Sequence, residues 1–428
     1  MSDTSDQWAA LESENERLVD PTIGPLPVTP ATPVPPVAGP AAPDARPRAP
    51  DARPAAPPGR RPGRHRQRAV AAASAAALAV AGAAAWPASA AVSPDQSPAP
   101  ASWQTVLSVG APGDPAFTAV TATGRHRAWA FQSPDGPSAV PAWRLTSAGW
   151  SLAPSPGKDG HAVAAAGASS ARDVWAFTEQ GAGSRAFRWD GTRWVAAGSF
   201  TRDVGATVVL SSRDVWAFGA PNSARGGLGA RHYDGHRWKR LRSGRGLNSG
   251  SALSAHSIWA VGGKTIAHWN GHQWSRTSVA AIIPPDTQFC RPTVTAIYAR
   301  SSRSVWAVGA GNCEDEIGPG FLLHYDGHQW GRVAHASFGA PVGVVPDGSG
   351  GLWIPSYTGS GGPVHMVHYS GGSGGLLRNA QMPVGARRLR LLGIATAPGT
   401  PTAFAVGATF RRSMPGIDQA AVVFEFRN

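Results

Sequence analysis

Hydrophobic and polar positions repeat along most of this chain. From residue 102 onward, short apolar runs centred on an aromatic residue alternate with polar turns rich in Gly and Asp. One unit begins with V-W-A-V-G at Val305, continues through a polar segment and ends with H-Y-D-G-H-Q-W at Trp330. Closely similar sequences surround Trp216 and Trp259. Such self-similarity indicates a repeat architecture before any single residue is interpreted.

The period of the repeat predicts the fold class. The aromatic of the W-A-[VF] run occurs seven times, at intervals of 41 to 51 residues. These positions are Trp129, Trp175, Trp216, Trp259, Trp306, Trp353 and Phe404. A period of about 40–50 residues with several short strands per unit is typical of β-propellers. We therefore expect an all-β fold, a seven-bladed β-propeller with four-stranded blades.

Each unit divides into four predicted strands. In the fifth unit they are residues Thr293–Ala299, Ser304–Ala310, Gly320–Asp326 and Gln329–Ala334. The first strand of a unit is rich in small residues, which suits the crowded position nearest the axis, and the second carries the large aromatic, which can wedge between blades. Asp-Gly or Asn-Gly joins the third and fourth strands in four units, as a two-residue hairpin requires.

The two ends of the repeat region complement each other. The last unit lacks a fourth strand, whereas Ser102–Leu107 resembles a fourth strand that stands alone before the first unit. We expect residues 102–108 to pair with 421–427 and close the ring, because closure removes exposed sheet edges.

The first hundred residues have a different composition. Residues 1–68 form a Pro- and Ala-rich tail with a basic end, which we expect to be disordered. Residues 69–90 contain an apolar run, 69–86, that reads either as a signal segment cleaved near Ala88-Ser89-Ala90 or as an uncleaved transmembrane anchor. A linker follows at 91–101. Both readings place the propeller, 102–428, outside the cytoplasm, either secreted or tethered to the membrane.

The net charge of the chain excludes few classes of binding partner. The net charge is +13, but charged residues make up 15% of the chain and no dense Lys/Arg run follows residue 68. A basic surface of this kind favours anionic polymers in general. We expect no nucleic-acid partner, no cofactor and a monomer.

The two cysteines predict a disulfide. Cys290 precedes the first strand of the fifth unit and Cys313 follows its second strand, at equal distances from the turn between the strands. An antiparallel hairpin then places them opposite each other. A disulfide agrees with export, and two cysteines without clustered partner ligands predict no zinc site.

Candidate binding residues lie on the longer loops. The links from the second to the third strand, and from blade to blade, are long and irregular and share one rim. Binding residues tend to lie on variable loops carried by a rigid scaffold. The candidates are Asp286, Arg291, Glu314, Asp315, Glu316, Arg411, Arg412 and Asp418.

The repeated histidines point to structure and not to chemistry. His232, His268, His324 and His368 occupy equivalent places in four different units. Repetition spreads them around the ring, so we expect packing roles and no shared metal. We also name no catalytic residue, because no P-loop, dinucleotide-binding or nucleophile-elbow motif occurs.

The pair V-W-A-V-G and H-Y-D-G-x-x-W resembles the repeats of bacterial exported β-propeller proteins, and the turn resembles a degenerate Asp-box of sugar-active propellers such as sialidases. The resemblance covers about residues 102–428. It implies a propeller but not an activity, since fold does not carry function.

Three functional hypotheses remain open from the sequence. The first is a non-enzymatic extracytoplasmic propeller that binds a glycan, a cell-wall polymer or a protein through the rim with the long loops. The second is a sialidase-like glycan hydrolase or lyase that uses carboxylates such as Glu314, Asp315 or Glu316. The third is a membrane-tethered regulator with a cytoplasmic tail.

Overall fold

The structure, a computed structural model, describes residues 101–427 with short gaps. The gaps are 111–114, 134–139, 159, 182, 221–226, 242–243, 314–316, 334–337, 359–362, 372–374, 386–387 and 414–415. For residues 317 and 411–418 the structure describes the backbone pairing but not the side chains. Chain contacts separate residues 1–90 from 91–428. The tail, the apolar segment and the linker up to residue 100 lie outside the described residues, so their assignments stay predictions.

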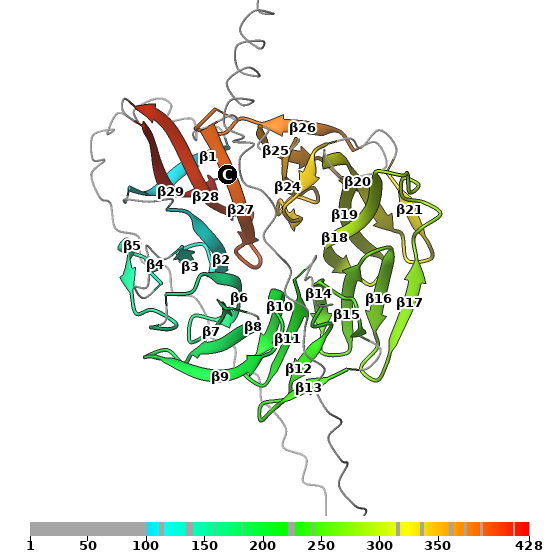
Figure 1. The fold of residues 1–428 in the computed structure, drawn as a ribbon, viewed down its shortest axis with the longest axis horizontal. Helices are drawn as coiled ribbons and strands as arrows, with labels where there is room; N and C mark the ends of the chain where they lie inside the picture. The colour runs from blue at the N-terminus through cyan, green and yellow to red at the C-terminus, as the bar shows by residue number, and fades with distance from the viewer. Residues whose placement is uncertain are drawn as a thin grey trace, which may run out of the picture. The chain divides into compact units, whose positions relative to one another are not determined.

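The described strands form seven antiparallel sheets arranged around a ring, which confirms the seven-bladed propeller (Figure 1). Blades one to three are β2 (Phe117–Gly124), β3 (Arg127–Gln132), β4 (Ala142–Thr146), β5 (Gly149–Ala153); β6 (Val163–Ser170), β7 (Asp173–Gln180), β8 (Gly183–Trp189), β9 (Trp194–Phe200); and β10 (Val204–Ser211), β11 (Asp214–Gly219), β12 (Arg231–Tyr233), β13 (Trp238–Arg240).

The remaining blades continue in chain order. Blades four to seven are β14 (Ser249–Ser254), β15 (Ser257–Gly262), β16 (Thr265–Trp269), β17 (Trp274–Ser278); β18 (Cys290–Ser301), β19 (Ser304–Cys313), β20 (Ile317–Tyr325), β21 (Trp330–Arg332); β22 (Ala340–Pro341), β23 (Val345–Pro346), β24 (Leu352–Tyr357), β25 (Val364–Tyr369), β26 (Leu377–Ala380); and β27 (Leu389–Thr396), β28 (Ala403–Ser413), β29 (Gly416–Arg427) with β1 (Ser102–Gly110).

The sixth blade departs from the expected four strands. Its inner strand is split into β22 and β23, both of which pair with β24. Each fragment contains a proline, Pro341 or Pro346. Proline cannot donate to a ladder hydrogen bond, so the two prolines account for the short pairings of this strand.

The ring closes as the sequence predicts. Strand β1 pairs with β29 in antiparallel register, from Ser102 opposite Arg427 to Gly110 opposite Ala420. The N-terminal strand thus supplies the outermost strand of blade seven. In Figure 1 the blue-cyan β1 lies beside the red β29.

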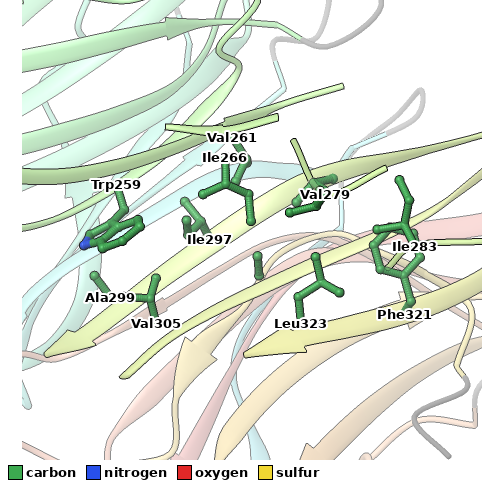
Figure 2. Packing of buried hydrophobic residues seen from close by; sticks show 12 residues of the cluster. Trp259, Val261, Ile266, Val279, Ile283, Ile297, Ala299, Val305, Phe321 and Leu323 are labelled. Atoms are coloured by element: carbon green, nitrogen blue, oxygen red, sulfur yellow. The ribbon is translucent and has the colours of Figure 1, made fainter. Parts of the chain in front are cut away.

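The second-strand aromatics wedge between blades, as expected. Trp259 of β15 packs with Ala299 and Val305 of the next blade, in the cluster that Figure 2 shows. Its ring centroid lies 5.2 Å from Tyr325 and 5.9 Å from Trp330. The same contact recurs from blade to blade and ends with Phe404 of blade seven, 6.1 Å from Trp150 of blade one. A continuous belt of tilted and edge-to-face aromatic contacts therefore links neighbouring blades.

The Asp-Gly and Asn-Gly turns form as predicted. Gly235, Gly271 and Gly327 adopt φ of 94°, 95° and 100°, a conformation that favours glycine. The side chain of the residue before each glycine accepts N–H bonds two and three residues later; Asp326, for example, accepts them from His328 at 2.8 Å and Gln329 at 2.9 Å. These bonds lower the pKa of the Asp326 carboxyl, and equivalent bonds to Arg193 and Thr192 lower that of Asp190 to about 2.

The disulfide is confirmed, and the hairpin around it is longer than expected. Cys290 and Cys313 are bonded and lie opposite each other at the ends of β18 and β19. The turn itself lies one residue later than the sequence suggested, because Ser301 pairs with Ser304. Two bulges on β18, at Thr295 and Arg300, restore the register at the cysteines.

Candidate functional site

A cavity of about 500 Å³ lies on the axis of the ring, between the inner strands. Its wall comes from one end of every inner strand, the end joined to the longer connections. Members from five blades are Thr118, Ala166, Thr207, Asn248 and Thr295. Small side chains at these positions leave the axis open, since seven strands converge there.

A repeated β-bulge shapes the cavity wall. Near this end, the inner strands of blades one, two, three, five and seven each carry one residue without a partner in the ladder. These residues are Thr118, Ala164, Gly205, Thr295 and Leu392, and all of them line the cavity. A bulge re-aims a strand and often lies beside a site. Here it adds one wall residue in each of these five blades.

The described residues of the cavity wall can form hydrogen bonds but carry no charged side chains. It contains Thr, Ser, Asn, Tyr and small apolar residues but, among the described residues, no Asp, Glu, His, Lys or Arg. The hydroxyl of Thr118 donates to the carbonyl of Val163 at 2.9 Å, and that of Thr207 to the carbonyl of Trp216 at 2.8 Å. The hydroxyl oxygens keep lone pairs that can accept from a ligand.

Asn248 contributes an unsatisfied acceptor to the same wall. Its side-chain oxygen Oδ1 is buried and has no hydrogen-bond partner among the described residues. Buried polar atoms in proteins are normally paired, so an orphan atom in a cavity wall points to a missing partner. The atom is shielded from the cavity, so a ligand N–H or O–H would pair with it only after the Asn248 side chain turns towards the axis.

Of the predicted site residues, the structure describes the side chains of Asp286 and Arg291. Asp286 is exposed and forms an ion pair with Lys264. Arg291 is exposed and stands beside Cys290 on β18, opposite Asn312, which lines the cavity. The Asp286 carboxylate is therefore engaged by a lysine and not by Arg291.

The other predicted site residues fall in less described parts. Glu314, Asp315 and Glu316 lie outside the described residues. Backbone pairing places Arg411 opposite Asp418 and Arg412 opposite Ile417 in the hairpin of β28 and β29. The side chains of these three charged residues are not among those described.

The four repeated histidines lie where packing requires them. Each one stacks on or tilts against the tryptophan opposite it; the centroids of Trp306 and His324, for example, are 3.9 Å apart. Each also has a hydrogen-bond partner on its own blade: Asp214 for His232, Ser257 for His268, Ser304 for His324 and Asp347 for His368. No group of three or more His, Cys, Asp or Glu that could hold a metal occurs in the described part of the chain.

Blade two uses the same device with different residues. Asp173, 5% exposed, accepts bonds from Trp175 Nε1 at 3.2 Å, Arg188 Nε at 2.7 Å and Ser169 Oγ. We call this arrangement the polar latch: the polar side chain two residues before the aromatic, at the acceptor position, hydrogen-bonds the side chain opposite that aromatic on the third strand. It recurs in blades two to five, with Asp173 and Asp214 as acceptors and the hydroxyls of Ser257 and Ser304 as partners of a histidine.

Blade one breaks the polar latch, and the sequence reading missed this. Arg127 occupies the acceptor position, and Arg144 lies opposite Trp129 where the other blades place the latched Arg or His. A second cavity of about 500 Å³ adjoins these residues, on the rim of the short turns, with Arg125 and His126 in its lining. Aligning the units at the residue two before the aromatic would have revealed the exchange of acid for base.

Comparison with known proteins supports the fold. No family model and no curated protein matches the sequence. Among solved structures, a catalytically inactive virginiamycin B lyase from Staphylococcus aureus with quinupristin is 13% identical, with a TM-score of 0.51 over 74% of this chain and 99% of the other. The extracellular domain of a putative hybrid two-component system from B. thetaiotaomicron is 11% identical, with a TM-score of 0.50 over 74% of this chain and 39% of that one. At such identities the likeness shows a shared β-propeller fold.

Proposed function

We propose that this protein is an extracytoplasmic binding protein that takes an uncharged segment of a glycan or cell-wall polymer into the axial cavity. The observation that carries the proposal is the uncharged wall of the axial cavity, which combines hydroxyls, the Asn248 amide and apolar groups. Sugar hydroxyls both donate and accept, so they can satisfy Asn248 and the threonine oxygens together.

The absence of charge in the described wall guides the choice of ligand class. A site without Lys, Arg, Asp or Glu in its described lining gives an ionic group no counter-charge, and a desolvated ion without a partner is costly. Tyr357 adds an amphipathic ring to the wall. These features support a neutral chain over an acidic or basic one.

The extracytoplasmic location rests on the disulfide and on the sequence before residue 91. Structural disulfides persist in oxidising compartments, and Cys290–Cys313 is such a bond. Among the described residues, no helix has the length and apolarity to cross a bilayer. Residues 69–86 lie outside that part of the chain, and their role as a signal or an anchor belongs to the proposal.

The hydrolase alternative has less support. It depends on Glu314, Asp315 and Glu316, which lie outside the described residues, while the described cavity wall carries no carboxylate. A pair of facing carboxylates is what glycoside hydrolysis requires. The binding experiment therefore includes a hydrolysis measurement on every glycan that is retained.

The test is a glycan-array screen with the full chain, followed by titration of the hits. Asn248→Leu removes the acceptor and is expected to weaken binding about tenfold, as for a buried hydrogen bond of about 1.4 kcal/mol. Ala164→Phe fills the cavity and is expected to abolish binding, whereas Ala196→Phe on the exposed outer strand β9 is the control. A glycan that binds the Ala164→Phe variant as well as the native protein would bind outside the axial cavity. Release of hydrolysis products from a bound glycan would establish an enzyme.

A further inference from the structure

We infer that the cavity of blade one on the short-turn rim binds the carboxylates of an acidic peptide segment. Its lining includes Arg125, His126, Arg127 and Arg144, together with Thr123, Thr146 and Ser147. The site lies on the rim opposite the axial cavity, so this inference stands or falls separately from the proposed glycan function.

The argument starts from what the same position does in the neighbouring blades. In blade two, the Asp173 carboxylate accepts from Arg188 Nε at 2.7 Å and Trp175 Nε1 at 3.2 Å. In blade three, Asp214 accepts from His232 Nε2 at 2.9 Å and Trp216 Nε1 at 3.0 Å. An aspartyl carboxylate is thus the group that this arrangement of an aromatic and an opposite cation receives.

Blade one has the cation but lacks the carboxylate. Arg144 pairs in register with Trp129, as Arg188 does with Trp175. Its acceptor position is filled by Arg127, a second cation. Within the described residues, no Asp or Glu forms an ion pair with Arg125, Arg127 or Arg144. Two arginines side by side repel each other, and an external anion would relieve that repulsion.

Arg144 is held ready for such a group. Its guanidinium carbon lies 5.6 Å from the ring centroid of Trp129 and 5.9 Å from that of Trp189, on the neighbouring blade. Cation–π contacts of this kind restrict the side chain. Guanidinium stacked on an aromatic ring keeps its edge N–H groups free to bind a carboxylate in a fork.

The surroundings favour several carboxylates in sequence over one isolated ion. Arg125, His126 and Arg127 are consecutive, exposed and adjacent to the turn between β2 and β3. A peptide with neighbouring Asp or Glu residues can place one side chain on Arg144, in the position of Asp173, and others on the exposed cations. Charge complementarity of this kind speeds encounter and sets specificity.

The experiment measures binding of a fluorescein-labelled hexaglutamate peptide to the full chain by anisotropy, with hexaglutamine as the neutral probe. Arg144→Gln is expected to weaken binding by about tenfold, since a charge-assisted hydrogen bond is lost. Arg127→Asp restores the repeat's own acid beside Arg144 and is expected to abolish binding while thermal stability is kept or raised.

Matched controls separate the site from general charge. Arg237→Gln and Arg237→Asp remove the same charges from an exposed turn of blade three. Equal losses with the Arg144 and Arg237 variants would overturn the inference. Tight binding of hexaglutamate by the Arg127→Asp variant would also overturn it. Tighter binding of polygalacturonate than of hexaglutamate would overturn it as well, because the pocket would then be assigned to acidic glycans.

Discussion

Trp103 and Trp353 meet edge to face, with ring centroids 5.4 Å apart and an interplanar angle of 77°. Trp103 lies on β1, the N-terminal strand, and Trp353 on β24 of blade six. Trp103 therefore takes the place that the Trp after the hairpin turn takes in other blades. The interface between blades six and seven is built by residues from both ends of the propeller.

Because Trp103 is buried at 4% exposure, Trp103→Ala should lower the free energy of unfolding by about 3–5 kcal/mol. Chemical denaturation followed by tryptophan fluorescence and circular dichroism would measure the loss. Gln104→Ala, at an exposed position of the same strand, is the control. Equal stability of the two variants would show that β1 is dispensable for closing the ring.

The polar latch predicts a stabilising substitution. Trp306 Nε1 is buried without an acceptor, whereas Trp216 Nε1 donates to Asp214. Ser304→Asp should supply the missing acceptor and keep a partner for His324, raising stability by about 1 kcal/mol. Ser304→Ala is the opposite control, because it removes the bond to His324 at 3.1 Å. A lower melting temperature for Ser304→Asp than for the native protein would contradict the latch in blade five.

Burial lowers the pKa of His268 and His324 below 6.5, the value that an exposed histidine has. The unfolded chain then binds more protons than the folded one as the pH falls below 6.5. The contribution of these two histidines to the free energy of unfolding is fully present above that value, and it is lost as the pH falls towards their pKa in the folded protein.

The variant with His268→Gln and His324→Gln should therefore lose less stability than the native protein between pH 6.5 and 5. Unfolding free energies across this pH range provide the measurement. His236→Gln, at an exposed turn, is the control substitution. Parallel slopes for the double variant and the native protein would refute the role of these two histidines.

The disulfide closes a hairpin with a sequence separation of 23 residues. Replacing both Cys290 and Cys313 by Ser should cost about 3 kcal/mol in the chain-entropy model. Reductant should destabilise the native protein and leave the double variant unchanged. If reductant has no effect on the native protein under conditions where the thiols are shown to be reduced, the bond does not contribute to stability.

Gly327, in a hairpin turn, and Gly331, in strand β21 of the same blade, provide a matched pair. Gly327 has φ of 100°, and a Cβ there would lie 2.9 Å from Arg303 Cγ, whereas a Cβ at Gly331 would meet nothing within 4 Å. Gly327→Ala should cost about 1–2 kcal/mol, the penalty of the left-handed conformation. Gly331→Ala should be close to neutral. Comparable melting temperatures for the two variants would mean that the hairpin adapts without strain.

The repeat made the blades, the ring closure and the disulfide predictable, because each follows from equivalent positions along the chain. The split inner strand of blade six was not anticipated, although Pro341 and Pro346 were visible in the sequence. Their effect depends on which strand must donate to the ladder, and only the pairing with β24 shows that.

The site was harder to predict than the fold. Charged loop residues such as Asp286 drew attention, whereas the axial cavity is lined by Thr, Ala and Asn residues that read as ordinary packing positions. The basic pocket was also overlooked, since Arg127 is one more arginine in a basic chain until it is compared with Asp173. What distinguishes the residues of the basic pocket is a departure from the repeat at the position two before the aromatic.

The bulged inner strands separate the needs of folding from those of recognition. Thr118, Ala164, Thr295 and Leu392 have no partner in the ladder, so the pairing rules that constrain the rest of each strand do not fix their identity. Gly205 also lacks a partner but is sterically fixed, because a Cβ there would lie 2.7 Å from the Cα of Ala220. Substitutions at these four positions would change the wall of the axial cavity without changing the strand pairing of a blade. What the axial cavity recognises can thus change while the pairing of the blades stays the same.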